Sequence, residues 1–240
     1  MRDTAESTPL MARLRNVGAY YWLRKGYLRH ERYWALRDVS FDLYPGDSLG
    51  VIGRNGAGKS TLLKLLSGIV KPDLGSAELF GHHATLLSLQ VGFVPYLSGR
   101  ENAILSGMLM GMHRDEMERR MGEIIAFSEL DEFIDQPISS YSAGMRARLG
   151  FSVAIQLDPD ILLIDEVLGV GDAQFQAKSS ARIHDIIRSR KTVVLVSHNA
   201  DTLRKLCNRA IWLEGGVTRA VGDTDSVLRE YNDYMLQTAG

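Results

Sequence analysis

This sequence has almost no cysteine and no hydrophobic run long enough to span a membrane. Its 240 residues include one cysteine, Cys207, which cannot form a disulfide within the chain, so we expect a reducing compartment such as the cytosol. A transmembrane helix needs about 20 consecutive apolar residues, whereas the longest uncharged apolar runs, such as residues 161–164, have the length of a strand. The first residues also lack the long apolar stretch of a signal peptide. If the protein works at a membrane, we expect another protein to hold it there.

Neither sign of charge dominates the chain. It carries 28 lysines and arginines against 29 aspartates and glutamates, a net charge of −1, whereas a dedicated nucleic-acid-binding domain is usually strongly basic. The apolar share of 45% and the charged share of 24% are those of an ordinary globular protein, which excludes a disordered chain, a collagen-like repeat and a disulfide scaffold. At about 100–200 residues per domain, the length fits one large domain or two small ones.

The sequence predicts strands that alternate with helices over much of its length. A half-buried strand is expected at residues 35–43, where apolar and polar residues alternate. Short buried strands are expected at residues 48–52, 161–164 and 192–196. A helical stretch at about 173–190 lies between the last two of them. This alternation is typical of βαβ units around a parallel sheet, so we predict an α/β fold. Residues of about 92–158 are mostly helical and interrupt the alternation, which indicates a separate lobe.

A glycine-rich segment directly after the expected strand at 48–52 carries the clearest chemical signal. It matches the phosphate-binding pattern G-x-x-x-x-G-K-[ST] throughout, with Gly53, Arg54, Asn55, Gly56, Ala57, Gly58, Lys59, Ser60 and Thr61. Glycines let the backbone turn its N–H groups toward one point, and the start of the next helix adds unpaired N–H donors, so a polyphosphate can bind there. Lys59 would neutralise the outer phosphates, and the Ser60 hydroxyl would complete the shell of Mg²⁺. The alternative is a strand-to-helix turn that binds nothing.

Two adjacent carboxylates follow another expected strand. Residues 161–164 would deliver Asp165 to the carboxyl edge of the sheet, where ligands of such folds bind, and Asp165 would hold Mg²⁺ through water. Glu166 would orient or deprotonate the attacking water. An Asp-Glu pair alone is a weak signal because such pairs are common on protein surfaces. Together with the glycine-rich segment, the pair predicts a site that hydrolyses a nucleotide.

A third segment, between these two, predicts the start of another helix. Ser142 is expected to cap that helix, and Gly144 keeps its first turn open to an anion. Because the glycine-rich segment already offers one helix start to a phosphate, the expected ligand of this second helix start is a nucleotide held by another copy of the chain. Taken alone, the segment would favour a plain capped helix.

These segments stand in the order and spacing of the ATPase subunits of ABC transporters, which the chain resembles over about residues 12–220. The string YSAGM, at residues 141–145, stands where that family has its LSGGQ-like signature. The strings SGREN at 98–102 and GVGDAQF at 169–175 narrow the resemblance. They are similar to those of ATPases that serve bacterial exporters of capsule, O-antigen and teichoic acid chains on lipid carriers.

The resemblance implies a role for several individual residues. The signature residues that would contact ATP across the dimer are Ser142, Ala143, Gly144 and Met145. Asp172 matches the D-loop, which contacts the opposite subunit, and Glu166 would be the catalytic base. His198, which follows Glu166 by 32 residues, matches the switch histidine that hydrogen-bonds the γ-phosphate. Tyr21 best matches the aromatic residue that stacks on adenine, with three rivals, namely Tyr20, Tyr33 and Trp34.

The resemblance also implies a fold and partners. The fold is a P-loop NTPase with a parallel sheet core, an antiparallel β edge and an inserted helical subdomain. The expected boundaries are a core at about 12–91 and 159–222, a helical subdomain at about 92–158 and a C-terminal helix at about 223–240. The protein would bind ATP and Mg²⁺ and work as a homodimer with two integral membrane permease subunits, on the cytoplasmic face of the bacterial inner membrane. Its ATP hydrolysis would power export of a lipid-linked polysaccharide that the permease handles, with no nucleic acid as partner.

The competing interpretation is a soluble ABC-type ATPase that acts on nucleic acid or ribosomes. Such proteins usually carry two cassettes in one chain or a long coiled coil, and this sequence has neither. A P-loop GTPase would carry an Asn-Lys-x-Asp guanine reader, which is absent, and a small-molecule kinase has no use for the YSAGM helix.

The chain departs from the family pattern at one position. The family usually has a glutamine in the loop that leads into the helical lobe, and alignment on SGREN puts Val94 there, with Gln90 four residues too early. If no side chain of this loop contacts Mg²⁺ or water, nucleotide sensing would rest on movement of the backbone of residues 92–99.

Two further segments each have two interpretations. Residues 13–37 hold seven lysines or arginines against one acidic residue, with six aromatic residues among them. That composition is typical of a solvated basic loop, or of a surface that meets anionic lipid head groups or the pyrophosphate of a lipid-linked glycan. Five of the nine methionines fall within residues 108–121, where they would pack in a core or line a groove for a short helix of the membrane partner.

Overall fold

The computed structural model describes residues 9–25, 30–87, 91–165 and 172–238. The chain divides into two compact units. Unit 1 consists of Met1–Leu86, Asp160–Glu166 and Ile186–Gly240, and unit 2 consists of Leu87–Pro159 and Val167–Asp185. Among the described residues, no helix combines the length and the apolar character that crossing a bilayer requires.

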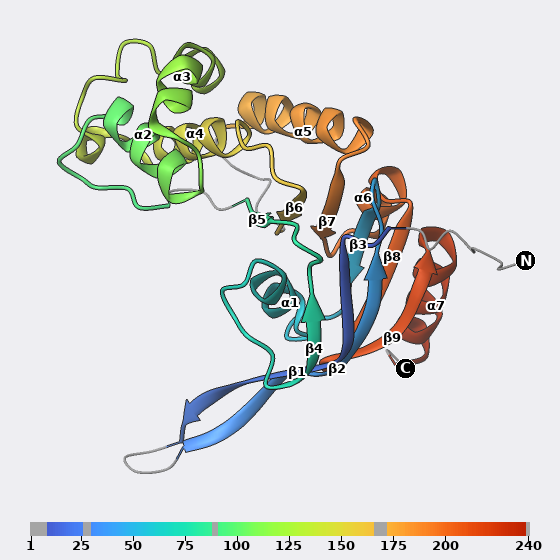
Figure 1. The fold of residues 1–240 in the computed structure, drawn as a ribbon. Helices are drawn as coiled ribbons and strands as arrows, with labels where there is room; N and C mark the ends of the chain where they lie inside the picture. The colour runs from blue at the N-terminus through green and yellow to red at the C-terminus, as the bar shows by residue number, and fades with distance from the viewer. Residues whose placement is uncertain (1–8, 26–29, 88–90, 166–171, 239–240) are drawn as a thin grey trace, which may run out of the picture. The chain divides into compact units, whose positions relative to one another are not determined.

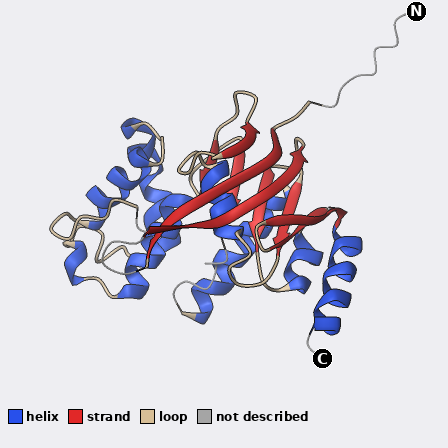
Figure 2. Ribbon diagram, turned by 90° about the horizontal axis from the view of Figure 1, so that it is seen from below, coloured by secondary structure: helices blue, strands red, loops and turns tan. Residues whose placement is uncertain are grey.

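Unit 1 is built on one mixed sheet with helices packed on it (Figures 1 and 2). Its nine described strands are β1 (Ala12–Arg24), β2 (His30–Leu43), β3 (Ser48–Ile52), β4 (Leu74–Glu78), β5 (Ala84–Leu86), β6 (Ile161–Ile164), β7 (Thr192–Val196), β8 (Arg209–Glu214) and β9 (Val217–Asp223). They lie in the order β4-β1-β2-β9-β8-β3-β7-β6-β5. The run from β8 to β5 is parallel, whereas β1 pairs antiparallel with β2 and β4, and β9 with β8. The predicted α/β class, with a parallel core and an antiparallel edge, is confirmed.

Three described helices belong to unit 1, namely α1 (Lys59–Leu66), α6 (Ala200–Leu206) and α7 (Thr224–Thr238). α6 packs on β3, α7 packs on β8 and β9, and α1 packs beside β2, β5 and β7. Every residue of the central strands β3, β6 and β7 is buried, as expected for parallel strands covered on both faces. The strands predicted at 48–52, 161–164 and 192–196 are confirmed. Because these strands are parallel neighbours, their carboxyl ends meet at one edge of the sheet.

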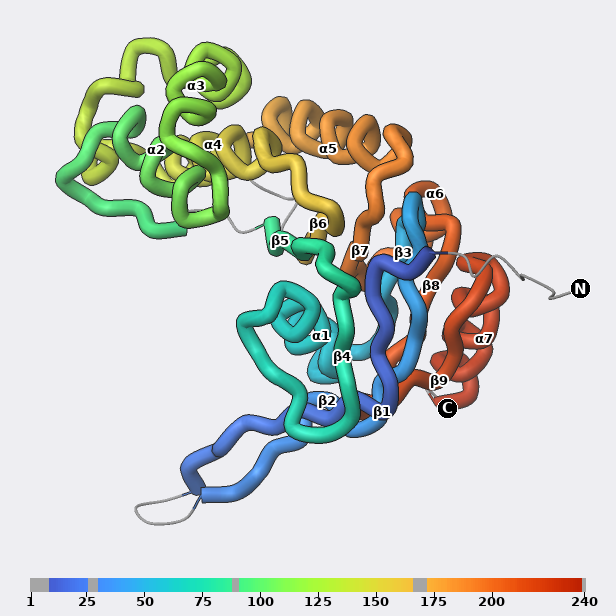
Figure 3. Tube along the Cα trace, in the orientation of Figure 1, coloured from blue at the N-terminus to red at the C-terminus, as the bar shows by residue number. Residues whose placement is uncertain are grey.

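β1 and β2 form a long hairpin that Figure 3 shows leaving the rest of the sheet of unit 1. Residues 13–18 of β1 also pair with β4. Farther out, residues 19–24 of β1 pair with residues 30–36 of β2, and no third strand flanks this outer half among the described residues. The interpretation of this segment as a loop is therefore wrong for the backbone, because its tyrosines and tryptophans favour paired strands. The expected solvent exposure is present at residues 21–25 and 30–33, in the outer half of the hairpin.

Unit 2 is helical. It contains α2 (Gly99–Leu109), α3 (Arg114–Ser128), the short 3-10 helix η1 (Ile138–Ser140), α4 (Ala143–Ala154) and most of α5 (Ala173–Arg188). Buried side chains of α2, α3, α4 and the segments between them form a core of its own, which includes Met117 and Met121. Met108 is exposed. The core interpretation of the methionine-rich segment is therefore correct for Met117 and Met121, and half-buried Met110 and Met112 pack against the same core.

Unit 2 extends beyond the helical subdomain that the sequence places at about 92–158. Of the described residues, it also takes in 172–185, which the sequence-based boundaries assign to the core. Aromatic packing explains this membership, because the ring of Phe175 on α5 lies 5.7 Å from that of Phe127 on α3 and 5.9 Å from that of Phe151 on α4.

Candidate functional site

The glycine-rich segment forms the turn between β3 and α1, as the sequence predicted. Gly58 has a φ of 104°, and a Cβ atom at this position would lie 2.5 Å from the carbonyl oxygen of Ala35. A side chain is excluded there by both the left-handed backbone and the close approach. No side chain caps the start of α1 within the described structure, so its first N–H groups are suited to an anionic ligand.

The ammonium group of Lys59 is folded back onto this turn. Its Nζ donates hydrogen bonds to the carbonyl oxygens of Gly53 at 2.7 Å and Arg54 at 3.1 Å, and the residue is only 8% exposed. Burial lowers the pKa of Lys59, while the charges of Asp165 and Glu214 act to raise it. Because a phosphate carries full negative charge, it would be a better partner for this ammonium than the two neutral carbonyls.

A cavity of about 410 Å³ opens beside the turn. The described residues that line it come from the glycine-rich segment, the hairpin, and the ends of β6 and β7, and they are Tyr21, Tyr33, Ala35, Asn55, Gly56, Ala57, Gly58, Lys59, Ser60, Thr61, Asp165 and Val196. Two motifs that were recognised separately in the sequence, residues 55–61 and Asp165, therefore line the same cavity. Gly53 and Arg54 lie at the entry of the turn and contact Lys59 through their carbonyl oxygens.

The cavity brings together two oxygen ligands that suit Mg²⁺. Ser60 is exposed in the first turn of α1, and Asp165 is half-buried directly after β6. Hydroxyl and carboxylate oxygens are hard ligands, and Mg²⁺ typically takes few of them from a protein and the rest from phosphates and water. In the part of the chain that the structure describes, no group of three or more His, Cys, Asp or Glu side chains could hold a metal. A metal at this cavity would therefore need phosphate or water oxygens as further ligands.

Two tyrosines of the hairpin line the cavity. Tyr21 and Tyr33 lie opposite each other in the β1–β2 register, and their exposed fractions are 37% and 45%. The Oη atom of Tyr21 lies 3.5 Å from Oγ1 of Thr61. Tyr20 and Trp34 also lie opposite each other, and their rings pack 5.1 Å apart, but neither is among the described lining residues. Of the four candidates for an adenine-stacking residue, the cavity favours Tyr21 and its rival Tyr33.

The predicted catalytic residues are described only in part. Glu166 lies outside the described residues. His198 follows β7 by two positions and is exposed. Val196, the last residue of β7, lines the cavity, and His198 is not among its described lining residues. Because Val196 pairs with Val51 of β3, His198 follows a strand that is a direct neighbour of the one leading into the glycine-rich turn.

In unit 2, Ser142 caps the start of α4, as the sequence predicted. Its Oγ accepts a hydrogen bond from the Met145 N–H at 3.1 Å. Ser142 and Ala143 are exposed, whereas Gly144 and Met145 are half-buried. The first turn of α4 therefore presents its N–H groups at the surface of unit 2, where an anion brought by another molecule can reach them.

Asp172, the predicted D-loop residue, stands at the start of α5. Its Oδ1 accepts a hydrogen bond from the Phe175 N–H at 2.9 Å, which caps the helix. The side chain is nevertheless 64% exposed, so it too can meet another molecule.

Val94, at the position where the resemblance would put a glutamine, is held through its backbone by Asn102. The Val94 N–H donates to Oδ1 of Asn102 at 2.6 Å, and Nδ2 of Asn102 donates to the carbonyl oxygens of Val94, Leu97 and Ser98 at 2.9–3.1 Å. Asn102 is fully buried. The sequence marked the string SGREN, which ends at this residue, but gave no signal for the contact. Gln90 lies outside the described residues.

Comparison with known proteins gives one family. Residues 36–169 match the model of the family described as ABC transporter. The O-antigen export system ATP-binding protein RfbB of Klebsiella pneumoniae is 48% identical over 208 residues, which cover 87% of this chain and 85% of that protein. RfbB of Myxococcus xanthus is 50% identical over 83% of this chain and 46% of its own length. The teichoic acids export ATP-binding protein TagH of Lactococcus lactis is 42% identical over 85% of this chain and 43% of its own length.

This chain thus spans less than half the length of the last two relatives. None of the three is named for an action on nucleic acid or ribosomes.

Solved structures share the fold. A dimeric ATP-binding cassette in a post-hydrolysis state, bound to ADP and phosphate, has a TM-score of 0.72 at 23% identity and covers 89% of this chain and 99% of its own. An ATP-binding subunit of an ABC transporter has a TM-score of 0.73 at 22% identity, with coverage of 92% and 93%. At this level of identity, the similarity concerns the fold alone.

Proposed function

The chain belongs to the ABC transporter family, and we propose that it is the ATP-binding and ATP-hydrolysing subunit that powers export of a lipid-linked polysaccharide across the cytoplasmic membrane. The observation that carries the ATPase proposal is the cavity of unit 1, in which Lys59, Ser60 and Asp165 come together. The proposed cargo is supported by relatives named for O-antigen and teichoic acid export. We propose a peripheral location at the cytoplasmic face of the bacterial inner membrane.

One chain would hold ATP with the residues of unit 1. Residues 53–61 would surround the phosphates with backbone N–H groups, and Lys59 would exchange its two carbonyl partners for phosphate oxygens. Tyr21 or Tyr33 would stack on the adenine. Ser60 and Asp165 would hold Mg²⁺, which when bound offsets the negative charge of the phosphates.

A second copy of the chain would supply the other wall of the site. The start of α4, residues 142–145, would place its N–H groups and the Ser142 hydroxyl on the γ-phosphate of ATP bound to the first copy. Asp172 would contact the opposite copy beside it. Two ATP molecules would then lie between the two chains of a homodimer, and each would be contacted by both.

Hydrolysis would need a base for the attacking water molecule. Glu166 would accept a proton from this water while the water oxygen attacks the γ-phosphorus. The bond between the γ-phosphorus and the bridging oxygen would then break, giving ADP and phosphate. His198 would hydrogen-bond the γ-phosphate and hold it in line. After hydrolysis, the γ-phosphate is no longer bonded to the nucleotide in the first copy. The contacts of α4 with this phosphate would then no longer connect the two copies, and the dimer would open.

Two integral membrane permease subunits would receive this opening motion. Unit 2 has a groove of about 340 Å³ whose described lining residues are Arg100, Glu101, Ile104, Arg114, Glu118 and Met121. A short cytoplasmic helix of the permease would dock there, with its apolar residues on Ile104 and Met121 and its polar residues on the charged rim. The permease would handle the lipid-linked polysaccharide itself.

The outer half of the hairpin is a second candidate for contact with the membrane or its lipid-linked cargo. Trp22 and Leu23 are exposed there, and the Arg32 guanidinium lies 4.9 Å from the ring centroid of Tyr20 and 5.3 Å from that of Trp22. A surface that combines exposed aromatic rings with cations suits anionic head groups or a pyrophosphate.

Membrane fractionation with and without the permease tests the proposed function. We expect the chain to sediment with membranes only when the permease is co-expressed. Co-sedimentation with ribosomes or nucleic acid in the absence of the permease would contradict the proposal and favour the soluble alternative.

A triple variant of the hairpin tests its contact with the membrane or the cargo. We expect Arg24→Ala, Lys25→Ala, Arg32→Ala to lower export while the ATPase activity stays intact.

A further inference from the structure

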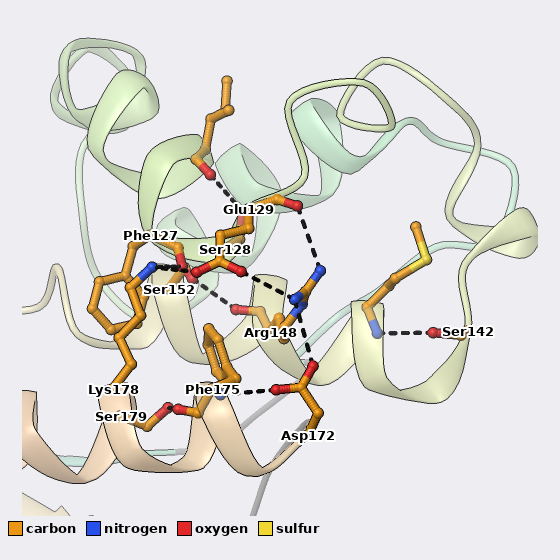
Figure 4. Close-up of polar contacts among 12 residues, drawn as sticks. Phe127, Ser128, Glu129, Ser142, Arg148, Ser152, Asp172, Phe175, Lys178 and Ser179 are labelled. Carbon is orange, nitrogen blue, oxygen red and sulfur yellow. Dashed lines mark hydrogen bonds and ion pairs between the residues drawn. The ribbon is translucent and has the colours of Figure 1, made fainter.

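One side chain of α4 contacts the carboxylate at the start of α5 (Figure 4). The starts of both helices are the parts of unit 2 that we propose to contact the opposite copy. Arg148 lies on α4, six residues after Ser142, which is about 9 Å along the helix axis. Its Nη1 lies 3.8 Å from Oδ2 of Asp172 and 3.4 Å from Oε2 of Glu129, and 19% of its side chain is exposed. The guanidinium of Arg148 therefore stands between two carboxylates, one directly after α3 and one directly before α5.

Asp172 uses its two carboxylate oxygens for different partners. Oδ1 accepts the hydrogen bond that caps α5, and Oδ2 faces Arg148. The orientation of the carboxylate is therefore fixed by α5 on one side and by α4 on the other. Because most of the side chain is still exposed, this fixed carboxylate remains accessible to a second molecule.

Glu129 and Lys178 complete the network on its other side. The Nζ atom of Lys178 donates to Oε1 of Glu129 at 2.8 Å and to the carbonyl oxygen of Phe127 at 2.9 Å. Cations and carboxylates thus alternate in the order Lys178, Glu129, Arg148, Asp172, and their charges balance. Arginine suits the bridging place in this row because its planar fork presents several donors in fixed directions.

A cluster of phenylalanines joins the same three helices. The rings of Phe127, Phe151 and Phe175 lie 5.7–5.9 Å from one another, and the Arg148 guanidinium lies 5.8 Å from the ring centroid of Phe175. Phe151 and Phe175 are fully buried. Buried aromatic packing stabilises the arrangement of the helices, whereas ion pairs with an exposed partner contribute little to folding stability. Removing the charge of Arg148 should therefore leave unit 2 folded and release Asp172.

We propose that Arg148 is a positioning residue that fixes Asp172, at the start of α5, relative to Ser142, at the start of α4. The two would then approach the opposite copy as one rigid body. The inference rests on the proposed function, since it assumes that both residues make contacts across an ATP-bound dimer. With their separation already set in the single chain, fewer side chains remain to be ordered when the dimer closes, and closure is favoured.

A double-mutant cycle tests the proposal. Arg148→Gln removes the bridging charge. Asp172→Asn removes the opposing charge but keeps an oxygen for the cap, because asparagine caps helices as well as aspartate does. Both variants and their combination are made in two backgrounds. In the Glu166→Gln background, sedimentation measures ATP-driven dimerisation. In the parent chain, steady-state kinetics measures kcat and KM. The affinity of the dilute, separate chain for ATP is measured alongside.

We expect each single variant to weaken ATP-driven dimerisation and to lower kcat by about tenfold, as for residues coupled through a direct contact. The ATP affinity of the separate chain and the thermal midpoint should not change. The double variant should be no worse than either single variant, because the second change removes a contact that is already lost. A merely structural arginine would instead lower the thermal midpoint and would not show this lack of additivity.

Arg120→Gln is the matched control. Arg120 also belongs to unit 2 and holds a helix end, since its Nη1 donates to the carbonyl oxygen of Gln156 at 2.6 Å, and its variant should dimerise like the parent. If Arg148→Gln does not fold, the same cycle is run with Arg148→Lys, which keeps the charge and the stem but not the fork. Unchanged dimerisation, or losses that multiply in the double variant, would overturn the positioning role. If the Glu166→Gln parent itself does not dimerise with ATP, the proposed function fails, and this inference fails with it.

Discussion

α1 and α4 both begin with a turn that suits a phosphate, but the two turns are completed in different ways. α1 follows Gly58, has no side-chain cap in the described structure, and starts at the nearly buried Lys59 beside a carboxylate in the same cavity. α4 follows Ser142, whose own hydroxyl caps the helix, and both Ser142 and the first helical residue, Ala143, are exposed. The start of α1 is therefore a site that can hold a charged ligand by itself. The start of α4 offers only N–H groups and a hydroxyl, so we propose that its ligand is held by another molecule.

Glu166→Gln should separate ATP binding at the two helix starts from ATP hydrolysis. Of the variants proposed here, we expect it to lower the rate of ATP turnover most. Loss of a general base typically slows turnover by about 10²–10⁴-fold, while the contacts that hold ATP remain. We expect steady-state ATPase activity to fall by this factor and an ATP-bound dimer to accumulate in sedimentation. Turnover equal to that of the parent would remove Glu166 from its assigned role.

Lys59→Met should break the α1 side of the comparison. Truncating one member of a buried charge pair costs about 2–5 kcal/mol of binding, a loss of at least about thirtyfold in affinity. Calorimetric titration of the separate chain with ATP measures this loss. Burial of the ammonium lowers the pKa of Lys59, which means that the charged form destabilises the folded chain when no nucleotide is bound. The thermal midpoint of the Lys59→Met variant without nucleotide should therefore not be lower than that of the parent. Unchanged ATP affinity would contradict the assignment of the cavity.

Ser142→Ala should break the α4 side alone. The separate chain should bind ATP as the parent does, while turnover falls by about tenfold, the worth of one hydrogen bond to a charged group. Loss of the cap should also cost about 1 kcal/mol of folding stability. Asp223→Ala is the control, since it removes a cap from the Ser226 N–H at the start of α7 and should lower stability without changing turnover. Equal turnover in both variants would leave the start of α4 as a plain capped helix.

Tyr21→Ala and Tyr33→Ala sharpen the description of the α1 site. Stacking of a base on an aromatic side chain is worth about 1–3 kcal/mol, so the variant that removes the stacking residue should bind ATP about tenfold more weakly. Its affinity for inorganic triphosphate, which has no base, should not change. An equal loss for both ligands would mean that the tyrosine supports the glycine-rich turn and does not read the base.

Cys207 should have the smallest effect, since it belongs to neither helix start. Burial raises the pKa of its thiol from 9.0 to about 12, so at pH 8 only about 10⁻⁴ of the folded chain carries the reactive thiolate. We expect alkylation at pH 8 to be at least about a hundredfold slower in the folded chain than in urea. Because the unfolded thiol ionises first, stability should be lost as the pH rises from 9 toward 12. Rapid alkylation of the folded chain would contradict the packing of Cys207 against Gly50.

The parts of the fold that the sequence predicts are those whose signal lies in consecutive residues. β3, β6 and β7 are short runs of buried apolar residues, and the glycine-rich turn is one unbroken motif between a strand and a helix. The cap of α4 at Ser142 is also local. Each of these features can be read within a window of about ten residues because the periodicity or the turn chemistry repeats within it.

The features that the sequence misses depend on residues far apart in the chain. The sequence named Tyr33 as a rival of Tyr21 but could not choose among the four aromatic candidates, because the register of β1 and β2 cannot be read from either strand alone. The loop at Val94 is fixed by hydrogen bonds from the buried side-chain amide of Asn102 to several backbone carbonyl oxygens. The membership of residues 172–185 in unit 2 follows from the packing of Phe175 on two other helices. Composition and spacing carry no information on such contacts.

The central claim is that one chain provides half of the catalytic site. The dependence of specific ATPase activity on protein concentration tests it most directly, measured at saturating ATP from well below to well above the concentration at which the Glu166→Gln variant dimerises. We predict that specific activity rises with concentration and reaches a plateau, and that Ser142→Ala and Gly144→Leu lower the plateau. Full activity in the most dilute samples, with Ser142 and Gly144 dispensable, would contradict the account.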